Sequence, residues 1–323
     1  MKRWIDKWNA YWFPLTSTQN LAGARILAVA AQLFWFFPSL DHQINLAAKN
    51  THFVDPQPII RAIASIVPRD ALFTPAGLRV VYWVTAAAGV LALIGLCTRA
   101  SLFVLALGTW FFVGHAYSYA DVHHPQALFA IFLMTLPFSP AGASYSIDAL
   151  LRRRRAGEAS RPSAGPPRSE TAMWPLKLVH VLLALTYFST GITKLLSGGV
   201  AWMNGYTLQN HIFNDAVNRD IPLGIWLAQQ HTLCILLAVG TILFEMLFFV
   251  SLFLPRIAPY FFIGGILFHV GLYLTSGHPF FEHIIMNLML LLFLDPQRLL
   301  GWINRLEQLV PGLPTRKDAP QPS

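Results

Sequence analysis

The sequence predicts an all-α integral membrane protein with about eight transmembrane helices in one bundle. Of its 323 residues, 55% are hydrophobic and 12% are charged, whereas soluble domains carry roughly 25% charged residues. The mean hydropathy is +0.50. Eight apolar spans follow one another, at about 20–40, 77–97, 101–119, 124–140, 174–196, 232–254, 258–275 and 281–296. The fourth and the last are short for a hydrocarbon layer of about 30 Å, which suits tilted or partly re-entrant helices.

Residues 1–19 precede the first span and predict a separate interfacial segment. Apolar and aromatic side chains recur there every three or four residues, at positions 4, 8, 11, 12 and 15, which is typical of a short amphipathic helix lying in the membrane interface. The first span ends at Phe37–Pro38–Ser39 without a small-residue cleavage site, so we interpret it as a retained helix and not a signal peptide. Residues 20–300 then form a single membrane domain.

The distribution of basic residues predicts the orientation in the membrane. If the N-terminus is cytoplasmic, six of the 23 Lys and Arg residues lie on the outer side: Lys49, Arg61, Arg69, Arg79, Lys194 and Arg219. The other seventeen lie on the inner side, in agreement with the positive-inside rule. An even number of spans returns the chain to the side where it began, so we expect both termini in the cytoplasm.

Two long outer loops, 41–76 and 197–231, carry amphipathic patterns. In the first loop, the apolar residues at 59, 60, 63, 66 and 67 fall on one helical stripe, and the second has a similar pattern around Leu208–Phe213. We expect both loops to form surface helices over the outer mouth of the bundle. On the inner side, residues 152–173 are basic and rich in Pro, Gly and Ser, which predicts a flexible linker. Residues 311–323 are expected to form a disordered cytoplasmic tail.

Charge and motifs exclude several classes of function. The net charge of +8 includes the run Arg152–Arg155, which is typical of a loop beside a membrane, so we expect membrane lipid and not nucleic acid as a partner. The sequence has no phosphate-binding loop, dinucleotide fingerprint or nucleophile elbow. His123 and His124 are adjacent, while His278 and His283 are five residues apart. Neither pair has the i, i+4 spacing of a helical zinc site, and we expect no metal.

The stretch 174–206 is the most informative part of the sequence. Its apolar span ends at Lys194, roughly 30 Å from the start of the span if it is helical, which is one hydrocarbon thickness. His180, Tyr187 and Gly191 share one helical face with Lys194. This polar line indicates that the face looks into protein or into a cavity. The alternative is a lysine whose stem simply extends to the lipid headgroups.

Three further polar residues lie within apolar spans. Glu245 and His269 fall near the middle of successive spans, and Asn287 lies six residues into the last. A charge at the bilayer centre costs at least about 2.5–3.5 kcal/mol on insertion scales, so it is normally paired inside the bundle. A structural hydrogen bond between helices, such as Glu245 with His269, is one explanation. A functional site is the other, and nine of the eleven histidines fall at or near the outer side in this topology.

The order and spacing of these residues resemble a known family. The run 187–195 (YFSTGITKL), followed by Trp202 and Gly205–Tyr206, is similar to the membrane domain of vitamin K-dependent γ-glutamyl carboxylase. It is also similar to bacterial proteins with a horizontally transferred transmembrane (HTTM) domain. Further matching positions are Arg25 in the first span, His124 and Ser146–Asp148 around the fourth, Glu245 in the sixth and Phe268–His269 in the seventh.

The resemblance implies an enzyme of a bacterial inner membrane with an outer-face site for a reduced quinone. In the family's chemistry a lysine acts as base on a vitamin K-like hydroquinone, which then reacts with O2. The strong base so formed removes a γ-proton from a peptide glutamate before CO2 adds, a carboxylase-like lyase reaction. By motif match Lys194 takes the base position and His124 a supporting one. The expected cofactor contacts are Tyr187, Trp202, His123 and His269, and the expected structural polar core is Glu245, Asn287 and Arg25.

Two departures from the family pattern keep other functions open. The chain stops at residue 323 without the large outer domain that holds the recognition sequence of the substrate peptide in the animal enzyme, and Thr193 stands where the family has the first lysine of a doublet. A non-catalytic membrane partner in the maturation or export of a secreted peptide is therefore the alternative function. A transporter is a third class, but only His180 extends the polar path toward the inner side.

Overall fold

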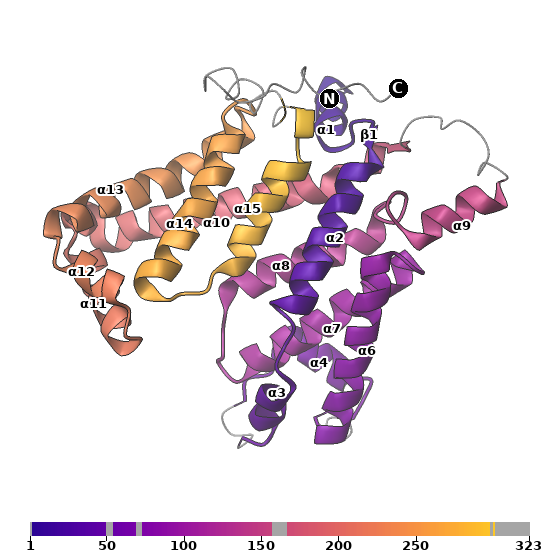
Figure 1. Cartoon of the computed structure of the whole chain (residues 1–323), viewed down its shortest axis with the longest axis horizontal. Helices are drawn as coiled ribbons and strands as arrows, with labels where there is room; N and C mark the ends of the chain where they lie inside the picture. Colours follow the sequence, from indigo (N-terminus) through magenta and orange to yellow (C-terminus); the bar gives the residue numbers. More distant parts are fainter. Residues whose placement is uncertain (1, 50–53, 69–72, 157–166, 298–299, 301–323) are drawn as a thin grey trace, which may run out of the picture.

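The computed structural model describes residues 2–49, 54–68, 73–156, 167–297 and 300, and this part of the chain is almost entirely helical. The all-α prediction is confirmed. A helix lies at each predicted span: α2 (Thr18–Phe34), α6 (Pro75–Ile94), α7 (Thr98–Ser118), α8 (His124–Thr135), α10 (Trp174–Gly198), α13 (His231–Phe248), α14 (Ala258–Ser276) and α15 (Phe281–Phe293). Figure 1 shows these helices gathered into one body, with α10 and α13 inclined to α14 and α15.

Five helical segments among the described residues are long and apolar enough to cross a membrane. They are Pro75–Ile94, Thr98–Ser118, Glu170–Asn204, His231–Leu252 and Ala258–Ser276. The helices α8 and α15 are apolar but have 12 and 13 residues, so each reaches only about 18–20 Å at a rise of about 1.5 Å per residue. The helix α2 has 17 residues. The structure therefore supports five of the eight expected crossings by length.

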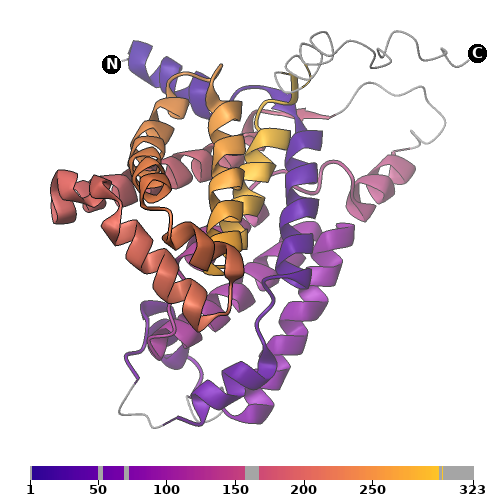
Figure 2. The ribbon, with the colours of Figure 1, turned by 60° about the vertical axis from the view of Figure 1, so that its left-hand side comes forward.

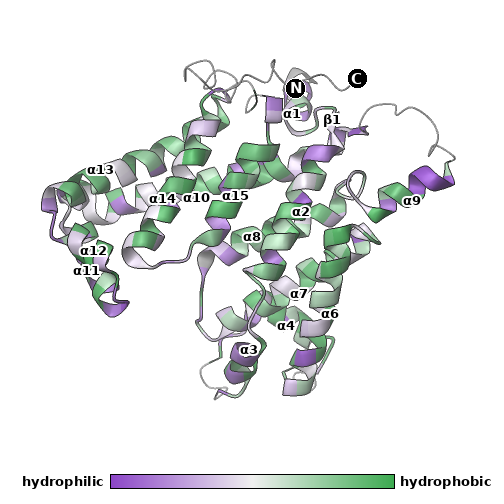
Figure 3. Cartoon of the chain, in the orientation of Figure 1, coloured by the Kyte–Doolittle hydropathy of each residue, from purple (hydrophilic) through white to green (hydrophobic). Residues whose placement is uncertain are grey.

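The lateral surface of the bundle, which the sides of the long helices form, is strongly apolar. Of the most apolar 18-residue stretch of each helix, only 28% is buried inside the protein in α6 and only 22% in α14. Figure 3 shows hydrophobic colour along the long helices and hydrophilic colour at the C-terminal tip of α9 (Ile147–Arg155) and on α3 (Leu40–Ala47). Apolar surface on this scale is unfavourable in water and is expected where helices face lipid. The described chain is thus built as an integral membrane protein.

Shorter elements gather at the two ends of the bundle. What we call the α1 end carries α1 (Lys2–Trp12) and the 3-10 turn η6 (Phe249–Leu252), as Figures 1 and 2 show. The opposite end, which we call the far end, carries four short helices that pack on α6, α7, α13 and α14. These are α3, α4 (Pro58–Ala64), α11 (Tyr206–Asn218) and α12 (Pro222–Ala228). They lie in the two loops for which amphipathic surface helices were predicted.

The predicted apolar stripe of the first loop is only partly correct. Ile60 is 3% exposed and packs, with Ile59 and Ile63, against the cluster around Phe111 and Phe112. The helix α4 ends at Ala64, however, and the next apolar residue, Ile66, is 85% exposed. The stripe stops there because the backbone leaves the helical path.

Regular structure occupies both ends of the predicted linker 152–173. At its start, residues 152–155 continue α9, and near its end β2 (Arg168–Ser169) pairs antiparallel with β1 (Thr16–Ser17), followed by the 3-10 turn η4 (Glu170–Ala172). Thr18 Oγ1 lies 2.6 Å from Ser144 Oγ beside this sheet. Residues 157–166 and the predicted tail 311–323 lie outside the described residues.

Candidate functional site

Lys194 and Glu245 form a two-point ion pair between α10 and α13. Lys194 Nζ lies 2.6 Å from Glu245 Oε1 and 2.7 Å from Oε2. The Glu245 side chain is 5% exposed and that of Lys194 is 26% exposed. A buried carboxylate on an apolar helix requires a cationic partner, because leaving it unpaired would cost several kcal/mol or more. Lys194 is that partner, and His269 contacts Tyr187 instead, so the hydrogen bond between Glu245 and His269 that was one explanation of these residues is wrong.

The direction of the Lys194 side chain explains how the amine reaches Glu245. Side chains on a helix lean toward its N-terminus, so the Lys194 stem runs back along α10 toward Gly191. The two helices approach closely at that point, where a Cβ atom on Gly191 would lie 3.0 Å from the Cβ of Glu245. The amine therefore turns into the bundle and does not extend to the headgroups.

The accessible side of the amine is aromatic and apolar. Trp202, in the 3-10 turn η5 (Gly199–Asn204), places its ring centroid 5.5 Å from Lys194 Nζ, within cation–π range. Leu196, later in α10, and Val200, in η5, are each 81% exposed. Lys194, whose side chain is 26% exposed, therefore lies in a part of the protein surface that carries aromatic and apolar side chains.

A second polar cluster joins α10, α14 and α15. The Tyr187 hydroxyl lies 2.9 Å from His269 Nε2 and accepts a hydrogen bond of 3.1 Å from Asn287 Nδ2. Asn287 Nδ2 also donates to the carbonyl oxygen of His283 at 2.9 Å. All four residues are buried. The predicted residues Tyr187, His269 and Asn287 are therefore in contact with one another, one helical turn or more away from Glu245.

Three polar atoms of this cluster have no hydrogen-bond partner among the residues that the structure describes. They are His269 Nδ1, His283 Nδ1 and Asn287 Oδ1. The rings of His269 and His283 lie 4.7 Å apart, so the three atoms belong to one small region. Buried polar atoms are nearly always satisfied, by protein or by ordered water. An ordered water or a hydroxyl group of a ligand would satisfy these atoms.

Histidines extend this cluster toward the far end around the ring of Phe280. His123, His269, His278 and His283 all place their rings within 6.3 Å of Phe280. His123 Nε2 lies 3.4 Å from Glu282 Oε2, and this ion-pair contact, opposed by burial, raises the pKa of His123 above its ordinary value. His123 and Glu282 line a cavity of about 400 Å³. The sequence analysis did not single out Glu282 or Phe280; the signal available was an acidic residue at the start of an apolar span.

The other predicted site residues lie elsewhere. Arg25 is fully buried and donates to the carbonyl oxygens of Ala141 at 3.0 Å and Tyr145 at 2.5 Å, so it joins α2 to the segment before α9 and not to the polar core with Glu245. His124 begins α8, but its side chain lies outside the described residues. Within the described ranges, no group of three or more His, Cys, Asp or Glu side chains could hold a metal ion.

Fold and site together define a class of protein: a helical integral membrane protein with ionisable side chains paired inside its bundle. Residues 16–297 match the model of the HTTM domain family, so the chain belongs to that family. The HTTM domain is a membrane domain related to vitamin K-dependent carboxylase. A search of curated proteins and a search of solved structures each gave no match.

Proposed function

We propose that the protein is an integral-membrane enzyme in which Lys194 acts as a base toward a reduced quinone in a carboxylase-like reaction. The observation that carries the proposal is the ion pair of Lys194 with Glu245, at 2.6 and 2.7 Å. A lysine alone at the membrane boundary stays protonated. Here a carboxylate lies close enough to the amine to accept a proton from it directly. Membership of the HTTM family supports the class of chemistry.

Glu245 serves to take up the proton that Lys194 must lose. In the charged pair the ammonium donates to the carboxylate. Moving one proton along this contact produces a neutral amine and a carboxylic acid, and apolar surroundings favour such a neutral pair over separated ions. The free electron pair of the amine would then be available to accept a hydroxyl proton from a bound hydroquinone, so that Lys194 would act as the general base.

The surroundings of Lys194 fit an aromatic, lipid-soluble ligand. The Trp202 ring provides a stacking surface, and the 26% exposure of the Lys194 side chain leaves the amine open to a ligand from outside the bundle. When bound, a reduced quinone would supply the electrons for reaction with O2, and CO2 would be the second co-substrate. Tyr187, His269 and Asn287 hold the polar core beneath the amine. The family resemblance assigns the supporting role to His124 and a cofactor contact to His123, and a peptide glutamate is the proposed substrate.

The test compares Lys194→Arg with Lys177→Arg, the same change at the other end of α10. Arginine can keep the two-point contact with Glu245 but stays protonated at any working pH, so it cannot act as a base. Oxidation of an added reduced naphthoquinone is measured in reconstituted membranes with O2 and bicarbonate, at equal protein abundance. We expect Lys194→Arg to lose about 100-fold or more of the activity, the contribution typical of a general base, and Lys177→Arg to retain it.

The same assay addresses the alternative function. A non-catalytic partner in peptide maturation would need the ion pair only for folding. The wild-type protein would then oxidise no quinol, and both arginine variants would fold and behave alike. Full quinol oxidation by Lys194→Arg would remove Lys194 from the mechanism.

A further inference from the structure

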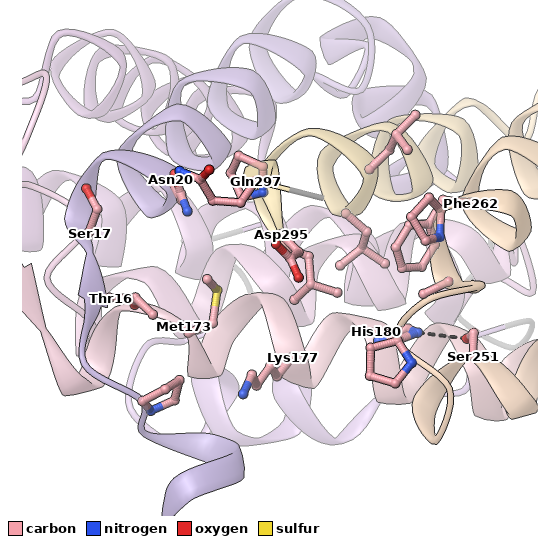
Figure 4. A pocket seen from close by; sticks show the side chains of 18 of the residues that line it. Thr16, Ser17, Asn20, Met173, Lys177, His180, Ser251, Phe262, Asp295 and Gln297 are labelled. Carbon is pink, nitrogen blue, oxygen red and sulfur yellow. Dashed lines mark hydrogen bonds between the residues drawn. The ribbon is translucent and has the colours of Figure 1, made fainter. Parts of the chain in front are cut away.

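A large cavity lies at the α1 end, at the opposite end of α10 from Lys194. Its volume is about 1020 Å³, near the upper limit of roughly 300–1000 Å³ for small-molecule sites. Figure 4 shows it between α10, the chain entering α2 and the end of α15. A cavity of this size at a helix end can accept a long ligand.

The two sides of this cavity differ in chemistry. One side is apolar and comes from η6, α14 and α15, where Leu252, Phe262 and Leu291 line it. The other side is polar, with Lys177 and Arg168 at its edge and Asp295 near the end of α15. Figure 4 shows the Lys177 side chain extending from α10 into this space. An amphiphile, with one polar and one apolar end, matches both sides at once.

The two cations of the cavity contact neutral groups. Lys177 Nζ donates to the carbonyl oxygen of Tyr11 and lies 4.5 Å from the centroid of the Tyr11 ring. Arg168 Nη2 donates to the carbonyl oxygen of Leu15 at 2.9 Å. In the described part of the chain neither forms an ion pair with a carboxylate. Their positive charge therefore remains available to an anion in the cavity.

The neighbouring elements indicate that such a ligand comes from lipid. Trp4 and Trp8 on the amphipathic helix α1 are 77% and 62% exposed, as expected of aromatic side chains at a membrane interface. Phe262 and Leu291, which line the apolar side, belong to helices of the bundle. A headgroup at Lys177 and a chain along Leu291 would follow the same direction as a lipid of that leaflet.

We propose that this cavity binds an anionic phospholipid, with its phosphate between Lys177 and Arg168 and an acyl chain against Leu252, Phe262 and Leu291. The bound lipid would hold the α1–β1 segment, through Tyr11 and Leu15, against the bundle. The proposal concerns a site separate from Lys194 and is independent of the proposed enzymatic function.

The test measures binding of two fluorescent lipids with the same chains, phosphatidylglycerol and phosphatidylcholine, to the full-length protein in detergent micelles. We expect tighter binding of phosphatidylglycerol, and Lys177→Gln should reduce that preference about fivefold, the effect of one basic residue near an anionic headgroup. The matched control is Lys7→Gln. It removes a cation at the same end of the molecule, but Lys7 does not line the cavity. Leu291→Trp should weaken both lipids by filling the apolar side.

Several outcomes would overturn the proposal. Equal binding of the two lipids by the wild type would show that the cavity does not discriminate headgroup charge. An equal loss of the preference for phosphatidylglycerol in Lys177→Gln and Lys7→Gln would show the same. Displacement of the lipid by glycerol 3-phosphate at matched concentration would indicate a site for a soluble anion. Displacement by a neutral short-chain quinol would indicate a quinone site. Melting curves without added lipid establish that each variant is folded.

Discussion

At the scale of single residues, the contact between His123 and Glu282 couples stability to pH. The contact with Glu282 raises the pKa of His123 above its ordinary value of 6.5; burial opposes this effect and the charge of Asp121 adds to it. A group whose pKa is raised on folding adds stability that is fully present below the unfolded pKa. That stability is lost as the pH rises through the folded value. The charged pair should therefore stabilise the protein most below pH 6.5.

The corresponding prediction concerns Glu282→Gln. The difference in melting temperature between wild type and this variant should be largest near pH 6 and should shrink as the pH rises above 6.5, because neutral His123 no longer benefits from the carboxylate. Thermal unfolding in detergent across this range measures it. His123→Gln should remove the same pH-dependent part, and adding Glu282→Gln to it should have no further pH-dependent effect. A difference that stays constant with pH would contradict the assignment.

The residues of the candidate site could be predicted, but their pairing could not. Lys194 and Glu245 stand out because each is a charge in or beside an apolar span. A count of residues along each span placed Lys194 at the membrane boundary and Glu245 at mid-depth, on the assumption that each helix stands perpendicular to the membrane. The observed pairing depends on the inclination of α10, which has 25 residues, and on the backward lean of the lysine stem. Glu282 could not be predicted as a site residue, because a charged residue at the start of a span needs no buried partner.

At the scale of helices, the close approach of α14 and α15 holds the buried amide of Asn287. A Cβ atom on Gly265 would lie 2.6 Å from Asn287 Oδ1 and 2.7 Å from both Cγ and Nδ2. Small residues at such interfaces allow membrane helices to pack closely. The amide cannot move aside without losing its bonds to Tyr187 and to the carbonyl oxygen of His283.

The prediction from this packing compares two glycine substitutions on α14. Gly265→Ala should lower the free energy of unfolding by about 1–3 kcal/mol, the usual cost of overpacking, and should reduce quinol oxidation as well. Gly271→Ala should not lower the free energy of unfolding and should leave quinol oxidation unchanged, because no atom of the described residues lies within 4 Å of a Cβ atom built there and alanine favours the helix. Denaturant unfolding in a fixed detergent measures the stability of both. Equal effects of the two changes would mean that the interface tolerates a methyl group.

Helix existence could be predicted from the sequence, whereas the small connecting elements could not. The long apolar spans specify helices because backbone groups in lipid must be satisfied internally. The pairing of β1 with β2 instead depends on contacts distant in sequence, such as Arg168 with the carbonyl oxygen of Leu15. The end of α4 at Ala64, before the last apolar residues of its stripe, likewise has no marker in the pattern.

At the scale of the whole molecule, the two ends differ in chemistry, and this difference bears on orientation. The α1 end carries the lipid-sized cavity and the basic run of α9, which ends at Arg155. Basic residues beside a membrane favour the cytoplasmic side. We therefore infer that the α1 end faces the cytoplasm and that the far end, with His123 and Glu282, faces outward.

Cysteine labelling tests this orientation at two exposed positions of the described chain. Ala156, at the end of α9, and Ser65, at the end of α4, are each replaced by Cys in a chain carrying Cys97→Ser and Cys234→Ser, because Cys97 is itself exposed. With a membrane-impermeant maleimide, Ser65→Cys should react in intact cells, and Ala156→Cys only after the membrane is permeabilised. Both should react fully in detergent, which controls for accessibility. The reverse pattern would place the α1 end outside, reverse the charge argument and require the Lys194 site to act from the cytoplasmic side.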